Sequence, residues 1–347
     1  MKYKLSIIIP FYFSDNEDID SKRYFSILAF EKCLKAVFKS QYKKFEVIAV
    51  SDGSSNDSIE IAKKYPCKII KIQKNSGAAF SRNVGAKKAK GQILVFLDSD
   101  VEIKSDALKI INSHFNKKKN YGMIQGIYSH VPNYKSYTNE YLQSYYSYYI
   151  FTEIKKNKFI KTLITNIFAI KESIFNNIGG FDANFSGANC EDQEFGFRLQ
   201  ENGHKIPIGR KLNTIHHVNF GVWEFVKKIT KIQIGEMKMH LRNKKTFLSK
   251  SKQSNYWGVI LGLLIITTIF FLIIVNLFLK IPCYTQTVTV LNLLFLVIHI
   301  RFFKFILLSK GLFPALRAIF FTYLHRLVVA NCAISGLVDF YIFRKKY

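Results

Sequence analysis

A run of 22 residues without a charged side chain extends from Gly258 to Leu279. At a rise of about 1.5 Å per residue, a helix of this length crosses the roughly 30 Å hydrocarbon core of a bilayer. A helix buried in a globular core is rarely apolar on every face over so many turns. We therefore expect a membrane span here, and the rest of the chain must fold in a way that is compatible with attachment to a bilayer.

Two further apolar segments follow, so we expect a membrane region at residues 257–347. Residues 284–300 carry few polar side chains and predict a second span. Four ionisable side chains, among them Arg326, interrupt residues 312–343, and charges at mid-membrane are costly. We expect this last segment to be interfacial or re-entrant, or else a third span.

Residues 223–256 are rich in lysine and precede the first span. Because cytoplasmic flanks of spans are basic, we expect a multi-pass protein of the cell membrane whose N-terminal domain is cytoplasmic. Apolar residues among the lysines of this segment predict an amphipathic helix that rests on anionic lipid, with a solvated connector as the alternative.

The formal net charge of +27 calls for an acidic partner: anionic lipid, nucleic acid or a phosphorylated substrate. The basic residues gather beside the predicted spans and no nucleic-acid motif is present, so we expect no nucleic acid as partner. The five cysteines lie far apart without a CxxC pair, which argues against a zinc site or a disulfide framework.

The first 222 residues alternate apolar runs with segments of helical periodicity, which predicts one α/β domain. The apolar runs are continuous, as in parallel strands that are buried on both faces. We expect a mostly parallel sheet covered by helices, with strands near residues 5–12, 45–52, 67–73 and 92–98.

Polar or small residues follow each expected strand, and the carboxyl ends of parallel strands are where such sheets bind ligands. Asp52 follows the second strand as a fixed acceptor for a base or a ribose hydroxyl, although this loop also reads as a helix cap. After the third strand, Gly77 permits close backbone approach, and Arg82 lies one turn into the next helix, within reach of a phosphate. The Walker A pattern is absent, which excludes a P-loop NTPase.

Asp98 and Asp100 follow the fourth strand, in the sequence FLDSD. In an extended chain these two side chains point the same way, because the side-chain period of a strand is two. Mg²⁺ and Mn²⁺ prefer oxygen ligands, usually one or two carboxylates together with substrate phosphates. The pair predicts a nucleoside-diphosphate site in which one carboxylate holds the metal and the other a ribose hydroxyl.

Together these motifs resemble those of family 2 glycosyltransferases with the GT-A nucleotide-sugar-binding fold. The resemblance covers about residues 4–220 and is carried by SIIIPFY, SDGSSNDS, NSGAAFSRNVGAKKAKG, FLDSD and residues 176–206. It implies a mixed, mostly parallel sheet followed here by membrane helices. It also implies inverting transfer of a sugar from a nucleotide-diphosphate sugar, with Mn²⁺ or Mg²⁺ as cofactor.

The resemblance also implies roles for single residues. Pro10 and Tyr12 would line the base pocket, and Asp52 would contact the base. Asp98 would lie on the ribose and metal side, and Asp100 would bind the metal. We add Gly180, in a turn expected to be mobile near donor and acceptor, to the donor-binding residues. Of the pair His216 and His217, we select His217 as a metal ligand, because some members of the family use such a histidine.

A second acidic cluster, Glu191 and Asp192, fits the need of an inverting transfer for a carboxylate that takes the proton of the attacking hydroxyl. By family position Asp192 is the expected base and Glu191 its support. Glu194 and Arg198, four residues apart, are expected to form an ordinary helix pair.

We expect a lipid-linked or glycan acceptor near the membrane, in the synthesis of cell-surface glycan or glycolipid. A polyprenyl-phosphate sugar synthase is an alternative, in which a phosphate acceptor would need no strong base. A nucleotidyltransferase and a non-enzymatic membrane scaffold are the remaining alternatives. The QxxRW signature of processive synthases is absent, which disfavours processive synthesis.

Overall fold

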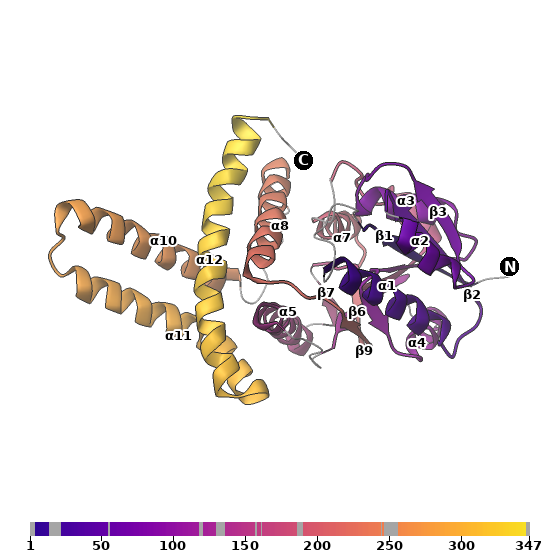
Figure 1. The fold of residues 1–347 in the computed structure, drawn as a ribbon, viewed down its shortest axis with the longest axis horizontal. Coiled ribbons are helices and arrows are strands. Elements are labelled where there is room, and N and C mark those ends of the chain that lie inside the picture. The colour runs from indigo at the N-terminus through magenta and orange to yellow at the C-terminus, as the bar shows by residue number, and fades with distance from the viewer. Residues whose placement is uncertain are drawn as a thin grey trace. The chain divides into compact units, whose positions relative to one another are not determined.

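The computed structural model separates the chain into two compact units, which we describe one at a time (Figure 1). The first unit is made of Met1–Tyr134 and Ile154–Asn219, and the second of Lys135–Glu153 and Phe220–Tyr347. The structure describes residues 4–13, 22–54, 56–117, 121–129, 136–156, 158–160, 162–185, 190–243, 245 and 256–344.

The first unit is built on a mixed sheet of nine described strands, in the order β3-β2-β1-β4-β8-β6-β9-β5, with β7 paired to β9. The first four strands of that order are mutually parallel, and β8 is antiparallel to β4. The strands are β1 (Leu5–Phe11), β2 (Phe45–Asp52), β3 (Lys68–Ile72), β4 (Ile93–Leu97), β5 (Val101–Ile103), β6 (Met123–Tyr128), β7 (Phe159–Ile160), β8 (Ile167–Lys171) and β9 (Ile206–His216). The predicted α/β fold with a mixed, mostly parallel sheet is confirmed.

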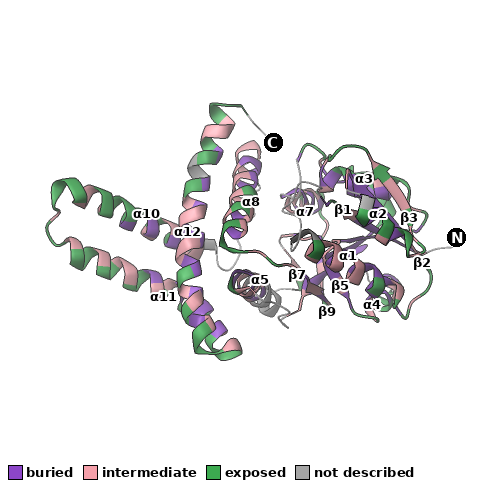
Figure 2. Ribbon diagram, in the orientation of Figure 1, coloured by how far each residue is buried: buried purple, intermediate pink, exposed green. Residues whose placement is uncertain are grey.

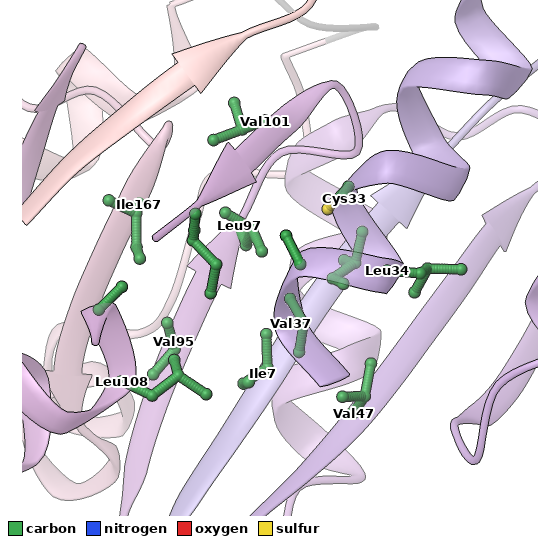
Figure 3. Close-up of a cluster of buried hydrophobic side chains, with 14 of the residues drawn as sticks. Ile7, Cys33, Leu34, Val37, Val47, Val95, Leu97, Val101, Leu108 and Ile167 are labelled. Atoms are coloured by element: carbon green, nitrogen blue, oxygen red, sulfur yellow. The ribbon is translucent and has the colours of Figure 1, made fainter. Parts of the chain in front are cut away.

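Helices cover both faces of this sheet, because its strands are apolar on both sides. Ile7 of β1 packs in one buried cluster with Leu34 (Figure 3), while the next residue, Ile8, packs in a second cluster on the opposite face. This is the two-residue period of a strand that is buried on both faces. Figure 2 shows buried residues along the strands and on the helices that cover them. The helices are α1 (Lys22–Phe38), α2 (Asn56–Lys63), α3 (Ala78–Lys87), α4 (Ala107–Phe115), α6 (Glu172–Ile178) and α7 (Glu191–Glu201).

The second unit is helical. Its helices are α5 (Tyr137–Lys156), α8 (Val222–Arg242), α10 (Tyr256–Leu279), α11 (Tyr284–Lys310) and α12 (Leu312–Tyr341). The helices α10 and α11 form a hairpin, and α12 runs across it beside α8 (Figure 1). Three segments are long and apolar enough to cross a membrane: 258–279, 284–310 and 312–341, with mean hydropathies of 3.0, 2.1 and 1.4.

The amphipathic helix expected after residue 222 is present as α8, but its apolar face packs on other helices of the unit. Phe225 lies 6.1 Å from Phe321 of α12, ring centroid to ring centroid. Further along, Lys238 forms an ion pair with Asp339 at 3.0 Å. The two helices therefore run parallel, side by side, over several turns. Residues 244 and 246–255 of the predicted basic segment lie outside the described residues.

Candidate active site

Asp52, at the carboxyl end of β2, holds the loop that leads into α3. Its two carboxylate oxygens accept the backbone N–H groups of Ser76 and Gly77, each at 2.8 Å. The residue is only 4% exposed, so most of the acceptor surface expected to read a base already contacts this loop. Asp52 fixes the position from which α3 begins.

Two glycines let this loop approach β2 closely. Gly53 has a φ of 72°, in the left-handed region, and a Cβ there would lie 2.7 Å from the backbone nitrogen of Asn75. Gly77 has a φ of 93° and caps the N-terminus of α3. The Gly77 N–H donates to the Asp52 carboxylate, and close approach of the Gly77 backbone to a donor stays a prediction.

Arg82 is buried and joins two acidic segments. Its Nη1 donates to Glu191 at 2.8 Å, and its Nη2 donates to Asp98 and to the hydroxyl of Thr165, both at 2.8 Å. The side chains of Arg82 and Glu191 are 4% and 3% exposed. The guanidinium expected to reach a phosphate is therefore engaged with two carboxylates. The glutamate lies 109 residues further along the chain.

Asp98 and Asp100 have different partners. The residues after β4 form a turn, in which Val101 N–H donates to the carbonyl of Asp98, so the chain is not extended here. Asp98 contacts Arg82, whereas the Oδ2 of Asp100 lies 3.1 Å from the Nε2 of His216. Burial raises the pKa of the Asp98 carboxyl. The positive charge of Arg82 lowers it and so offsets part of this rise. Asp100 is the more exposed of the two side chains, at 39% against 27%.

His216, which sequence reasoning did not select, is the histidine that lies beside Asp100. The antiparallel pairing of β5 and β9 sets Val101 opposite His216, and the imidazole stacks on Tyr128 at 4.8 Å. The selected His217 is 3% exposed in its side chain and pairs through Nε2 with Glu102 at 2.7 Å. Its backbone N–H also donates to the carbonyl of Asp100.

Asp100 and His216 fit a divalent metal only as part of its ligand set. Among the described residues, no group of three or more His, Cys, Asp or Glu side chains could hold a metal ion. A carboxylate and an imidazole suit Mn²⁺, and one or two protein ligands suffice where substrate phosphates complete the shell. The donor set is therefore consistent with an ion that binds together with a diphosphate.

Asp192 is the second residue of the helix α7, directly after Glu191. Its Oδ1 accepts the N–H of Gln193 at 2.7 Å. Loss of solvation raises the pKa of this carboxyl well above its usual range, and the negative charge of Glu191 adds to the effect. A carboxylate with a raised pKa is a stronger base than an exposed one, which suits proton abstraction near neutral pH.

The turn that contains Gly180 is anchored on two sides. Arg198 donates to the carbonyls of Ile178 and Gly180, each at 2.7 Å, and also pairs with Glu194 as expected. Asn83 of α3 accepts the N–H of Phe181 at 2.9 Å. These contacts tie the turn to α3 and α7, and its mobility near the donor stays a prediction.

Pro10 and Tyr12 lie at the carboxyl end of β1, the strand between β2 and β4. Pro10 is partly buried opposite Val50, and Tyr12 is 45% exposed. The structure thus places them at the same edge of the sheet as Asp52 and Asp98, the edge that was expected to bind the donor.

Comparison with known proteins gives two family matches. A model described as glycosyl transferase family 2 matches residues 6–179, and a model described as glycosyl transferase family group 2 matches residues 93–331. Glycosyltransferase YibD of Escherichia coli is 33% identical over 104 residues, which cover 29% of this chain and 27% of that protein. Cholesterol galactosyltransferase of Borreliella burgdorferi is 34% identical over 122 residues, which cover 34% of this chain and 30% of that protein.

The match thus covers less than a third of the length of either relative. Among solved structures, mannosyltransferase PcManGT from Pyrobaculum calidifontis is similar with a TM-score of 0.59. It is 13% identical, and the match covers 98% of this chain and 88% of that one, which supports the fold. Since a family model matches half of the sequence, and a second extends into the C-terminal helices, the chain belongs to glycosyltransferase family 2.

Proposed function

We propose that the chain transfers a sugar, with inversion, from a nucleotide-diphosphate sugar to a hydroxyl acceptor at a membrane. The observation that carries this proposal is the buried guanidinium of Arg82, which bonds Asp98 at the end of β4 and Glu191 at the start of α7. It brings the donor-side acidic motif and the acidic helix together. Inverting transfer needs both: a site for the diphosphate and, across the sugar, a base.

In this mechanism Asp192 accepts the proton of the acceptor hydroxyl as it attacks the sugar, and the raised pKa of its carboxyl suits that task. Pro10 and Tyr12 flank the base, and Asp52 holds the loop before α3 in place. Asp100 and His216 would hold Mn²⁺ or Mg²⁺, with Asp98 beside them. When bound, the ion would neutralise the charge of the departing diphosphate.

Neighbouring proteins support the choice of donor and acceptor classes. PcManGT was solved with GDP-mannose and Mn²⁺, and the name of the Borreliella relative gives cholesterol, a membrane lipid, as its acceptor. We therefore favour a lipid-linked or membrane-proximal acceptor. Polyprenyl phosphate is the second candidate, but a phosphate nucleophile would make no use of the raised basicity of Asp192.

We place α10 and α11 across the membrane and α12 along its surface. The support comes from α8, which runs beside α12 from Phe225 to Lys238. Lys227 and Lys231 are exposed on this part of α8. If α12 crossed the bilayer, both lysines would enter hydrocarbon, at a cost of about 2.5–3.5 kcal/mol each near the centre.

The side chains of α12 agree with a surface position. Arg326 is 1% exposed and faces other helices of the unit, while Phe313 and Phe320 are exposed. A helix with an apolar outer face and charges turned toward protein suits the boundary between headgroups and acyl chains. On this placement the basic α8 lies at the level of anionic headgroups, and the catalytic unit is cytoplasmic.

The test is a donor screen with the full chain in detergent micelles. UDP-, GDP- and dTDP-sugars are each supplied with Mn²⁺, and release of nucleoside diphosphate is measured with and without membrane lipid extract. We expect one nucleotide class to be turned over, and lipid extract to accelerate it. Release of pyrophosphate would instead identify a nucleotidyltransferase, and no turnover of any donor would contradict the proposal.

A further inference from the structure

The imidazole of His216 is held by three separate constraints, one of which comes from Tyr128. Its backbone is fixed because β9 pairs with β5, which sets His216 opposite Val101. Its Nε2 atom lies 3.1 Å from Oδ2 of Asp100. The plane of its ring is fixed by Tyr128, the last residue of β6, because the two rings lie within 18° of parallel with their centroids 4.8 Å apart.

Tyr128 is itself firmly supported. The pairing of β6 with β9 sets it opposite Thr214, and the N–H of Ser129 donates to the carbonyl of Thr214 at 2.7 Å. Side chains alternate along a strand, so Thr214 and His216 lie on the same face of β9, and Tyr128 stands within reach of the imidazole. Its ring is partly buried and packs against the cluster of buried side chains that includes Leu212. Tyr128 therefore offers the imidazole a fixed surface.

The contact with Asp100 alone would leave the imidazole free to turn. The ring can rotate about the line that joins Nε2 to the carboxylate oxygen, and the terminal torsion of an aromatic side chain is broad. The flat face of Tyr128 removes this freedom, because stacking selects one ring plane. Stacked rings also attract each other beyond what their burial contributes. The pair therefore holds the imidazole in place before any ligand binds.

The position in which the imidazole is held matches the geometry of a metal ligand. In an octahedral shell with bond lengths of about 2.1 Å, neighbouring ligand atoms lie about 3 Å apart. Nε2 of His216 and Oδ2 of Asp100, at 3.1 Å, have nearly this separation, so little movement is needed for both to bind one ion. This step rests on the metal site of the proposed function.

We infer that Tyr128 is a positioning residue that holds the imidazole of His216 as a metal ligand and thereby favours Mn²⁺ over Mg²⁺. Mg²⁺ is a hard ion that prefers oxygen ligands and keeps several waters, so it gains little from a nitrogen ligand. Mn²⁺ is a transition metal that binds mixed nitrogen and oxygen sites, so a well-placed imidazole adds more to its affinity. Tyr128 acts through His216 and needs no contact with the ion.

The test is calorimetric titration of the full chain in detergent micelles with Mn²⁺ and with Mg²⁺. Each titration contains the nucleoside diphosphate (UDP, GDP or dTDP) that the chain releases from its donor. Tyr128→Leu removes the flat ring and keeps an apolar side chain. We expect its affinity for Mn²⁺ to fall about threefold to tenfold, as the loss of an aromatic pair would give, and its affinity for Mg²⁺ to stay unchanged. In donor turnover, KM for Mn²⁺ should rise while kcat at saturating Mn²⁺ is retained.

Matched variants assign the effect to the stacked ring. Tyr128→Phe keeps the ring and should keep both metal affinities. Tyr121→Leu makes the same change two residues before β6, where Tyr121 packs edge-on against Phe159 at 4.9 Å, and it should also keep them. If Tyr128→Leu does not fold, Tyr128→Met takes its place, because methionine fills irregular gaps and is well tolerated.

A double-mutant cycle links the effect to the imidazole. His216→Gln should lower the affinity for Mn²⁺ by itself. In that background Tyr128→Leu should cause no further loss, because the group that it positions is gone. A loss that persists in the His216→Gln chain would show that Tyr128 acts on the site by another route, and would overturn the inference.

Three other results would overturn it as well: unchanged affinity for Mn²⁺ in Tyr128→Leu, an equal loss for Mn²⁺ and Mg²⁺, or a loss in Tyr128→Phe as large as in Tyr128→Leu. Any of these in a chain whose wild type binds Mn²⁺ and turns over donor contradicts only the role of Tyr128. A wild-type chain that binds neither metal, or turns over no donor, contradicts the proposed function.

Discussion

Four acidic side chains of the candidate site form two groups, which differ in what surrounds their oxygens. Asp98 and Glu191 contact the buried guanidinium of Arg82, and Glu191 is 3% exposed. Asp100 is more exposed, and its Oδ2 lies 3.1 Å from the Nε2 of His216. Asp192 lies beside the buried group without a direct bond to Arg82 among the described contacts. We expect the first group to hold the site together and the second to react with ligands.

The largest effect is expected from breaking the buried group. Arg82→Gln would leave Asp98 and Glu191 without their cation, and removal of one partner of a buried ion pair costs about 3–5 kcal/mol. We expect the free energy of unfolding to fall by that amount, measured by urea unfolding of the chain in detergent with far-UV circular dichroism. Arg210→Gln makes the same chemical change at an exposed side chain and serves as control. A loss below about 1 kcal/mol would show that the carboxylates are solvated without Arg82.

Asp100→Asn should have the opposite profile: little change in stability and a large loss of activity. Loss of a group that holds transition-state charge lowers the rate by about a hundredfold to a thousandfold. We expect kcat/KM for the donor to fall by that factor and Mn²⁺ affinity in the presence of nucleoside diphosphate, measured by calorimetry, to fall with it. Glu102→Gln, two residues away, is the control and should keep Mn²⁺ affinity. Unchanged binding of Mn²⁺ in Asp100→Asn would remove this residue from the metal site.

Asp192→Asn tests the base. General-base catalysis contributes about 10²–10⁴-fold, and we expect a loss near the lower end of this range for a hydroxyl acceptor, with donor affinity unchanged. Glu201→Gln, on the same helix, is the control. Transfer at the wild-type rate would exclude the base role and favour a phosphate acceptor.

The pH profile sharpens the same prediction. The base acts only when deprotonated, so the rate should rise with pH through the pKa of Asp192. Burial and Glu191 raise that pKa, so the acid limb should lie above the value of about 3.9 for an exposed aspartate. Glu191→Gln removes a negative charge and should move the limb toward lower pH, and Asp192→Asn should abolish it.

The parallel half of the sheet and the edge at which its loops gather were predictable, because each apolar run ends in a polar loop of distinct composition. The partners of the site residues were not. Arg82 meets Glu191 across 109 residues, and His216 reaches Asp100 only through the pairing of β5 with β9. The periodicity of a single segment carries no information about which distant strand pairs with it. For the same reason the apolar face of α8 could be found, but not its partner α12.

The smallest effect separates two roles of Asp52. Its carboxylate accepts the N–H groups of Ser76 and Gly77, and Asp52→Asn leaves one acceptor for these two donors. A hydrogen bond to a charged group contributes about 1.5–3 kcal/mol, so we expect a loss near the lower end of that range in the free energy of unfolding. If Asp52 only holds the loop, KM values for donors with different bases should change by one common factor. If it also reads the base, as the family resemblance implies, discrimination between UDP- and GDP-sugars should change as well. Measuring both donors in Asp52→Asn therefore decides whether this residue belongs with the group that holds the site or with the group that contacts ligand.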